Sequence, residues 1–247
     1  MLSADVASIE RATVAAVSPE SLEESDGWLL PFDSGTIGRA KSAVPLRHAV
    51  VDEAMVGKIE ARYQAHGMPA VFRLATESCF DGLRLELVRC GYVPEKPTLV
   101  QIGSARRMRQ VSSQTPAETA EAPDAAWTAL FLGEGFDPVD GASRLQTLSR
   151  ARGSVYASVR ENGAVVAAGA TAFSQGWASV HGMRTAPAKR GRGLAGRAMA
   201  GLAGAAIHCG MERVFLQVEA GNAAANALYR RAGFEPAWAY QYWRRPA

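Results

Sequence analysis

Residues 183–200 read MRTAPAKRGRGLAGRAMA, and the organisation of the rest of the chain follows from this stretch. Its pattern predicts the end of a strand, a turn at Pro187, a glycine-rich loop, and then a helix of small residues. Glycines in the loop let the backbone approach a ligand closely, and the first N–H groups of a helix have no partner within it. Together with the helix dipole and the side chains of Arg190 and Arg192, these donors predict a seat for a phosphate or pyrophosphate.

A second informative stretch lies downstream, where Val214 to Val218 predicts a buried strand and Ala223 to Arg231 a helix that ends before Gly233. Asn222 and Tyr229 are seven residues apart, close to two turns of helix, so they share one face. A tyrosine placed there could protonate a departing thiolate, which for a positioned acid accelerates a reaction by about 10²–10⁴-fold. The alternatives are a tyrosine packed in the core and an asparagine that only caps its helix.

Together, the two stretches resemble the GNAT N-acetyltransferase superfamily over roughly residues 105–247. The cofactor loop of that superfamily has the form Q/R-x-x-G-x-G/A, and its second motif is L-x-V, then N-x-x-A-x-x-L-Y, then G-F. The matching loop residues are Arg190, Gly191, Arg192, Gly193, Leu194 and Ala195. The matching residues of the second motif are Leu216, Val218, Asn222, Ala225, Leu228, Tyr229, Gly233 and Phe234. The resemblance implies a mixed α/β sheet with flanking helices and a bound acyl-CoA.

The same resemblance implies an acyltransferase that moves acetyl from acetyl-CoA to an amine by direct attack in a ternary complex. In that reaction Tyr229 is the general acid, while the loop and Asn222 hold the cofactor. We expect Met183 and Thr185 to lie against the amide arm of the cofactor, as in strand addition, with a backbone N–H there as an oxyanion donor. Transfer of a longer acyl chain is one alternative, and a CoA-binding sensor or interaction module without turnover is another.

The general base is less well defined by the sequence. His181 has a side chain of suitable ordinary pKa and lies on the strand before the loop, but a packed strand histidine is an equal alternative. Glu219, at the end of the next predicted strand, could act directly or through water, or serve only as a structural carboxylate. Glu134 lies in a loop that resembles the acceptor-side loop of the superfamily, where it would bind a cationic substrate or remain solvated.

The first part of the chain resembles the second. Residues 83–101 and 225–243 each contain a helix, a Gly-aromatic pair, a proline and a strand, which favours a duplication over chance similarity. We therefore predict a degenerate GNAT-like domain at 1–103 and an acetyltransferase domain at 104–247, as in tandem GNAT proteins. When Gly91 is aligned with Gly233, Leu87 replaces the tyrosine, and no loop like 190–195 occurs. One active site per chain is expected.

Other elements are expected along the chain. Trp28 to Phe32 predicts a strand, and Arg39 to Val44 a returning strand. Residues 104–124 have a linker-like composition, with a strand near residues 108–111. An Asn-Gly pair at 162–163 predicts a tight hairpin.

The net charge and the residue composition exclude several classes of function. A formal charge of +3 over 247 residues, with no long basic run, argues against nucleic acid as a partner. The cysteines and histidines lack the spacing of a metal site or a disulfide frame, so we expect no metal and a cytoplasmic location. The N-terminal stretch predicts an amphipathic helix, not a signal peptide, and no membrane span is expected. The expected partner is a small-molecule or peptide amine acceptor, and the choice between monomer and homodimer stays open.

Overall fold

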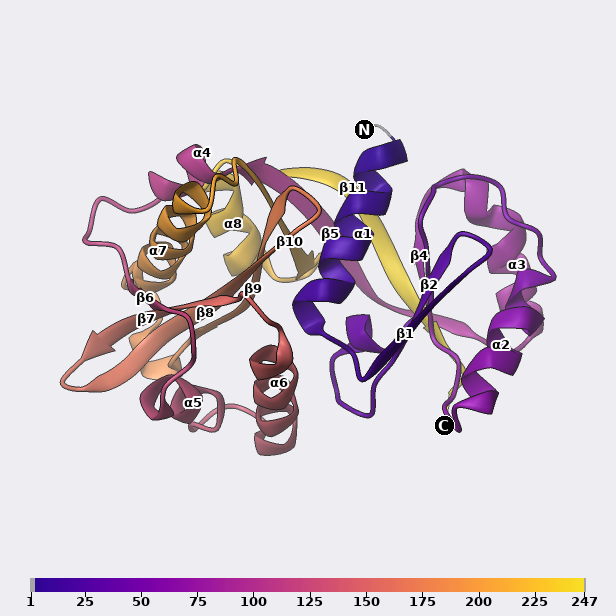
Figure 1. The fold of residues 1–247 in the computed structure, drawn as a ribbon, viewed down its shortest axis with the longest axis horizontal. Helices are drawn as coiled ribbons and strands as arrows, with labels where there is room; N and C mark the ends of the chain where they lie inside the picture. The colour runs from indigo at the N-terminus through magenta and orange to yellow at the C-terminus, as the bar shows by residue number, and fades with distance from the viewer. Residues whose placement is uncertain (1–2, 247) are drawn as a thin grey trace.

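The computed structural model describes residues 3–246 and has a mixed α/β fold (Figure 1). Its strands are β1 (Ser21–Ser25), β2 (Trp28–Phe32), β3 (Val44–Pro45), β4 (Phe72–Ala75), β5 (Val93–Ser104), β6 (Glu118–Ala120), β7 (Val155–Glu161), β8 (Ala164–Ser174), β9 (Trp177–Thr185), β10 (Arg213–Glu219) and β11 (Glu235–Arg244). Its helices are α1 (Ser3–Val17), α2 (Met55–Ala65), α3 (Asp81–Arg89), α4 (Ala105–Arg109), α5 (Ala125–Phe131), α6 (Pro138–Arg150), α7 (Leu194–His208) and α8 (Ala223–Arg231), with single 3₁₀ turns η1 (Gly38–Ala40), η2 (Ser78–Phe80) and η3 (Pro187–Lys189). Within residues 3–246, none of the helices combines the length and the apolar character needed to cross a membrane.

One large sheet connects the two halves of the chain. Eight strands follow the order β4-β11-β5-β10-β9-β8-β7-β6, and β1, β2 and β3 form a smaller sheet beside β4. Side chains alternate between the two faces of a strand, so neighbouring residues of β10 enter different cores. Phe215 packs in a core with Ile9 of α1, whereas Leu216 packs in a core with Leu202 of α7. The sheet therefore separates an α1 face from an α7 and α8 face.

The last strands of the two halves are exchanged. β5 pairs with β10 of the C-terminal half, β11 pairs with β4 of the N-terminal half, and β5 and β11 pair with each other. With Gly91 aligned on Gly233, Val93 corresponds to Glu235 and Ile102 to Arg244. In the ladder, Val93 pairs with Arg244 and Ile102 with Glu235, so the register has the symmetry that the duplication predicts. Figure 1 shows both strands crossing the middle of the molecule, while the boundary near residue 103 stays a prediction.

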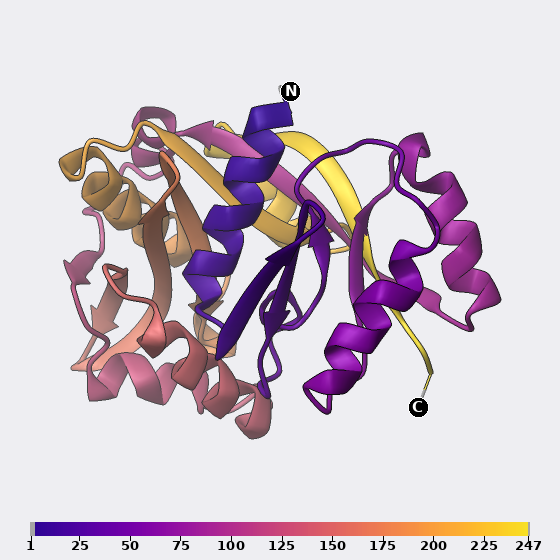
Figure 2. The same ribbon diagram turned by 45° about the vertical axis from the view of Figure 1, so that its right-hand side comes forward.

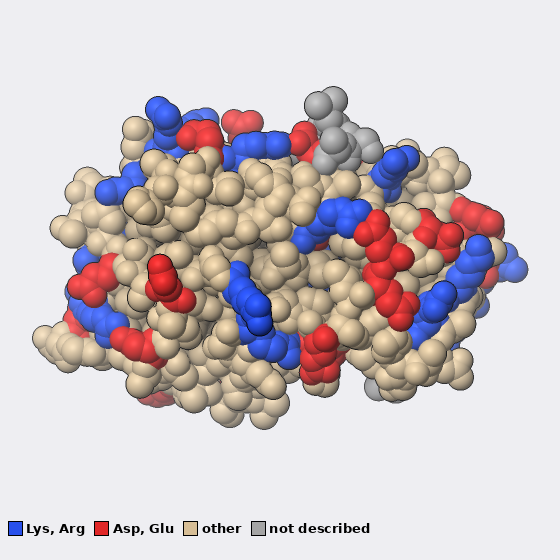
Figure 3. Space-filling model, in the orientation of Figure 1, with Lys and Arg blue, Asp and Glu red and all other residues tan. Residues whose placement is uncertain are grey.

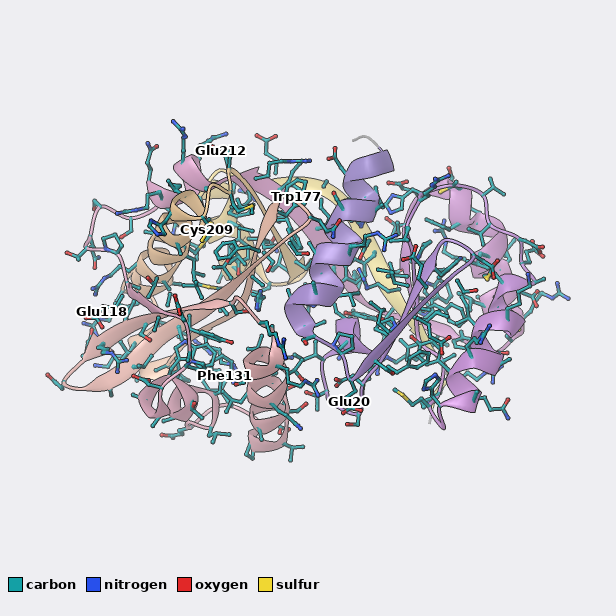
Figure 4. All side chains as sticks on the ribbon, viewed as in Figure 1. Glu20, Glu118, Phe131, Trp177, Cys209 and Glu212 are labelled. Carbon is teal, nitrogen blue, oxygen red and sulfur yellow. The ribbon has the colours of Figure 1, made fainter. Side chains whose placement is uncertain are left out.

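Helix α1 lies between the halves in both views (Figures 1 and 2) and is fixed to each of them. Toward the N-terminal half, Glu10 forms an ion pair with Arg73 of β4 at 2.6 Å, and their side chains are 2% and 0% exposed. Burying a charge is costly unless it is paired, so this contact fixes the relative position of α1 and β4. Toward the C-terminal half, the indole N–H of Trp177 donates to Ser8 Oγ at 2.9 Å, and Figure 4 shows Trp177 beside α1.

Several expected elements are confirmed and two are corrected. The α1 helix, the β2 strand and the Asn-Gly hairpin are present, with φ of 49° at Asn162 and 80° at Gly163. The expected strand at 39–44 is wrong, because η1 and only the first residue of β3 occupy it. The expected strand near 108–111 is also wrong: Ser104 accepts a hydrogen bond from Arg107 N and caps α4.

Strand β1 was not expected because its residues are mostly polar. It pairs with β2 along its whole length, from Ser21 opposite Phe32 to Ser25 opposite Trp28. The turn between them is Asp26-Gly27, with φ of 51° and 80°. Asp-Gly is a strong hairpin signal, so this turn, and not the hydrophobic pattern of residues 21–25, is the feature of the sequence that indicates the strand.

Candidate functional site

The site is formed where two parallel strands part. β9 and β10 pair only over Ala178–Val180 and Val214–Leu216. Beyond these residues β9 stays with β8 and β10 stays with β5, so their facing edges separate. Gly182 interrupts β9 with a φ of 62°, and neither Gly182 nor Met183 has a partner in the ladders of the described chain. Backbone groups on such an edge can bind an extended ligand as an added strand.

The glycine-rich loop directly follows this edge. Gly191 and Gly193 both have φ of 77°, a left-handed conformation that side chains disfavour. Gly193 is also the N-cap residue of α7 and provides no side-chain cap, so the first N–H groups of that helix remain available. Leu194 is buried and anchors the helix, whereas the glycines are exposed. Exposed donors at the start of a 15-residue helix are the arrangement expected for the predicted anion seat, and binding of a phosphate there stays a prediction.

The basic residues of the loop are arranged unequally. Arg192 and Lys189 both form ion pairs with Glu161 of β7, each at 2.9 Å. Hydrogen bonds from Lys189 and then Arg192 hold the pKa of Glu161 below its ordinary value. Arg190 is exposed and forms no ion pair within the described part of the chain, so its guanidinium is the one available to an anion. The sequence alone did not indicate Glu161, because it lies in a distant hairpin.

Tyr229 belongs to the core on the α7 and α8 face, which also contains Leu216 and Val218 of β10. It is 8% exposed and its ring lies 6.1 Å from that of Phe234. Burial raises the pKa of its phenol to about 12, so the hydroxyl stays protonated near neutral pH. Among the described residues this hydroxyl has no hydrogen-bond partner, which leaves it free to donate to a ligand. Asn222 caps α8 by accepting from Ala225 N at 3.1 Å, so its capping role is confirmed while its contact with a cofactor stays a prediction.

The two candidate bases lie on the opposite face of the sheet. His181 is 6% exposed, and its Nδ1 lies 3.0 Å from Ser179 Oγ. Burial, and to a smaller extent the nearby charge of Arg39, lowers the pKa of His181 to about 3. The ring is therefore neutral at neutral pH and binds a proton weakly. Glu219 is exposed at the end of β10, where water can reach its carboxylate. The structure brings both residues to the parted strands, and their roles stay predictions.

An aromatic and charged cluster lies beyond the end of β9. Arg184 lies over the rings of Phe131 and Phe136, at 4.6 and 4.3 Å from their centroids, and its guanidinium donates to Asp140 at 3.4 Å. Phe131 lies between α5 and α6 in Figure 4. Glu134 is exposed in the loop that joins these helices. This cluster shapes the side of the site that the sequence assigned to the acceptor.

The N-terminal half reaches the same side. Thr36 N and Oγ1 donate to Ser143 Oγ and Asp140 Oδ1 of α6, at 2.7 and 2.8 Å. Arg150 of α6 forms an ion pair with Asp33, whose side chain is 1% exposed. On the face shown in Figure 3, a group of basic side chains lies at the centre, between the two halves. The loop after β2 therefore fixes the position of α6, a contact between distant segments that the sequence did not reveal.

Comparisons with known proteins identify the family of the chain and its fold. The family model described as "Probable histone acetyltransferase Rv0428c C-terminal" matches residues 3–243. A curated relative, the uncharacterized N-acetyltransferase YobR of Bacillus subtilis, is 25% identical over 244 residues, which cover 96% of this chain and 98% of the relative.

Solved structures share the fold over both halves of the chain. A GCN5-related N-acetyltransferase from Kribbella flavida has a TM-score of 0.72 at 20% identity, covering 98% of this chain and 96% of that one. A tandem GNAT protein from the clavulanic acid biosynthesis pathway has a TM-score of 0.60 at 13% identity, covering 97% and 94%. The fold class predicted from the sequence is confirmed.

Proposed function

The chain belongs to the Rv0428c C-terminal family, of GNAT-type N-acetyltransferases, and from this premise we propose that it transfers acetyl from acetyl-CoA to an amine acceptor. The observation that carries the proposal is the short pairing of β9 with β10, which ends after Val180 and Leu216. The gap that follows lies between an exposed anion seat and the free hydroxyl of Tyr229. Along that path, the loop before α7 is placed to bind the pyrophosphate of the cofactor, the edge of β9 its amide arm, and Tyr229 the sulfur of its thioester.

Binding is assigned to the edge of β9 and to the loop. The N–H groups at the start of α7, with Arg190, bind the pyrophosphate. Residues 182–185 align the amide arm, and a side chain at Gly191 or Gly193 would enter this seat. A Cβ built at Gly191 meets no atom within 4 Å, and one at Gly193 meets only Gln114 Nε2 at 3.4 Å, so the space over the loop is open to a ligand.

In the reaction, the amine attacks the thioester carbonyl carbon, the C–S bond breaks, and the attacking nitrogen loses a proton. Tyr229 gives its proton to the departing sulfur, acting from the α8 face. Glu219 receives the amine proton through water from the α1 face, since it is exposed and next to the gap. His181 is the weaker base candidate, because a group with a pKa of about 3 holds little of the proton at neutral pH. Direct attack in a ternary complex needs no acyl-enzyme.

Calorimetric titration with acetyl-CoA, together with thiol release from acetyl-CoA in the presence of an amine panel, tests the proposal. We expect saturable binding and release of thiol that depends on the amine. Tight binding with no transfer to any small-molecule or peptide amine would instead support a CoA-binding sensor.

A further inference from the structure

A small cavity lies on the α1 face of the sheet, at the point where β9 and β10 begin to part. Its volume is about 10 Å³, which is room for one water molecule or one nitrogen or oxygen atom of a ligand. The polar residues that line it are Thr13, Arg39, Ser179, His181 and Gln217. They come from α1, η1, β9 and β10, so both halves of the chain form its walls.

Three of these polar side chains, those of Gln217, Thr13 and Ser179, already have hydrogen-bond partners within the protein. Gln217 Nε2 donates to Thr13 Oγ1 at 2.9 Å, and its Oε1 accepts from the hydroxyl of Tyr240 at 2.8 Å. Ser179 Oγ donates to the carbonyl of Ala172 at 3.3 Å and accepts from the N–H of that residue at 3.2 Å. These three side chains therefore do not depend on a ligand for a hydrogen-bond partner.

His181 differs from them, because its Nε2 is buried and has no hydrogen-bond partner. With the Ser179 proton placed toward the carbonyl of Ala172, the remaining lone pair of Oγ faces His181 Nδ1 at 3.0 Å and accepts from it. The network thereby assigns the proton to Nδ1 and leaves a lone pair on Nε2. A buried acceptor without a donor is unfavourable, so a donor from a ligand or from water fits there.

Arg39 provides the opposite chemistry in the same cavity. It is half-buried and forms no ion pair or hydrogen bond within the part of the chain that the structure describes. Two other arginines near the junction are paired: Arg150 with Asp33, and Arg73 with Glu10. A half-buried guanidinium with five N–H donors and no carboxylate partner can bind an anion.

We propose that this cavity is the acceptor subsite, and that the acceptor is an amine that also carries a carboxylate, as an amino acid does. The inference rests on the proposed function. The amine nitrogen occupies the cavity and donates an N–H to His181 Nε2 while its lone pair faces the gap between β9 and β10, and the acceptor carboxylate lies outside the cavity, against the exposed part of Arg39. His181 then orients the amine and takes no proton. Tyr229 and the loop lie toward the other face, so the two substrates enter from opposite sides of the sheet.

The test uses sets of three compounds that share one side chain: an amino acid, its amide and the amine without the carboxyl group. Phenylalanine, phenylalaninamide and phenethylamine form one such set, and further sets vary the side chain. Each compound is titrated calorimetrically into the full chain saturated with CoA, which carries no acyl group and permits no turnover. We expect an amino acid to bind about tenfold to hundredfold more tightly than its amide or amine, as for hydrogen bonds to charged groups.

Arg39→Gln should remove that preference and leave binding of the amide and of the amine without a carboxyl group unchanged, while Arg39→Lys should restore part of it. Arg47→Gln is the matched control, because Arg47 is an exposed arginine of the same half and lies outside the cavity. If no amino acid binds more tightly than its amide, or if Arg39→Gln keeps the preference, the inference is overturned. Failure of the proposed function has a separate signature, since it is the absence of thiol release from acetyl-CoA with every amine.

Discussion

Replacement of Tyr229 by Phe separates catalysis from binding and from folding. The hydroxyl of Tyr229 has no partner among the described residues, so its removal breaks no hydrogen bond within the protein. The ring keeps its edge contact with Phe234, 6.1 Å between centroids. We therefore expect the free energy of unfolding to change by less than about 1 kcal/mol, as for a substitution that leaves no buried group unpaired.

The rate should change far more than the stability. A positioned general acid contributes about 10²–10⁴-fold, so we expect kcat to fall by at least about 10²-fold. The affinity for acetyl-CoA should stay within about twofold, because the binding groups lie in the loop and along β9 and not at the phenol. Burial raises the pKa of Tyr229 to about 12, so the wild-type rate should show no loss from ionisation of this phenol below about pH 10.

The assay is thiol release at saturating acetyl-CoA and amine, with calorimetric titration of acetyl-CoA and urea denaturation on the same preparations. Tyr63→Phe is the control, because its buried hydroxyl donates to the carbonyl of Pro31 at 2.9 Å, far from the gap. That variant should lose about 1 kcal/mol of stability and keep its kcat. Unchanged kcat in Tyr229→Phe, or a large loss of acetyl-CoA affinity, would refute the acid role.

Three further outcomes are expected. Gly193→Glu should abolish acetyl-CoA binding in calorimetry, whereas Gly176→Glu, at a similar φ of 75° with open space around it, should bind normally; equal binding by both would contradict the anion seat. Arg73→Met should lower the free energy of unfolding in urea by about 3–5 kcal/mol, and adding Glu10→Leu should recover most of that loss, whereas no recovery would mean that the charge pair is not the cause. Burial lowers the pKa of His181 to about 3. As the pH falls through about 6.5, the unfolded chain therefore takes up a proton at this residue and the folded chain does not. The contribution of His181 to the free energy of unfolding is complete above about pH 6.5 and falls by about 1.4 kcal/mol per pH unit below it. His181→Asn should therefore lose less stability than wild type between pH 7 and pH 5 in urea titrations, and an identical loss would show that His181 is not the group responsible.

Features of the fold that depend on neighbouring residues were predictable from the sequence. The loop at 190–195 and the helix that carries Tyr229 are each written within a dozen residues, and their glycine, asparagine and aromatic positions follow from backbone conformation and helix period. The duplicated pattern at 83–101 also predicted a second copy of the final strand. Local rules sufficed for these elements because the conformation of each one is set mainly by residues close to it in the sequence.

Contacts between distant segments were not predictable in the same way. Nothing next to Thr36 indicates that it hydrogen-bonds to α6, and nothing next to Arg192 indicates its pairing with Glu161. The pKa of His181 likewise depends on residues from α1 and η1 that bury it, so the sequence left its role as a base open. These properties arise only after the halves pack together, and single-sequence patterns carry no record of that packing.

The exchange of β5 and β11 has a consequence for how the protein is made. β4 is an early strand, yet its partner β11 is synthesised after every other strand of the described chain. During synthesis, the edge of β4 that pairs with β11 therefore stays unpaired until β11 has been made, and such edges can associate with other chains. Pairings this distant in sequence form slowly, because the intervening chain must close before any contact forms. A nascent chain released before residue 235 would lack the strand that joins β4 to β5, so β11 decides whether β4 becomes part of the large sheet.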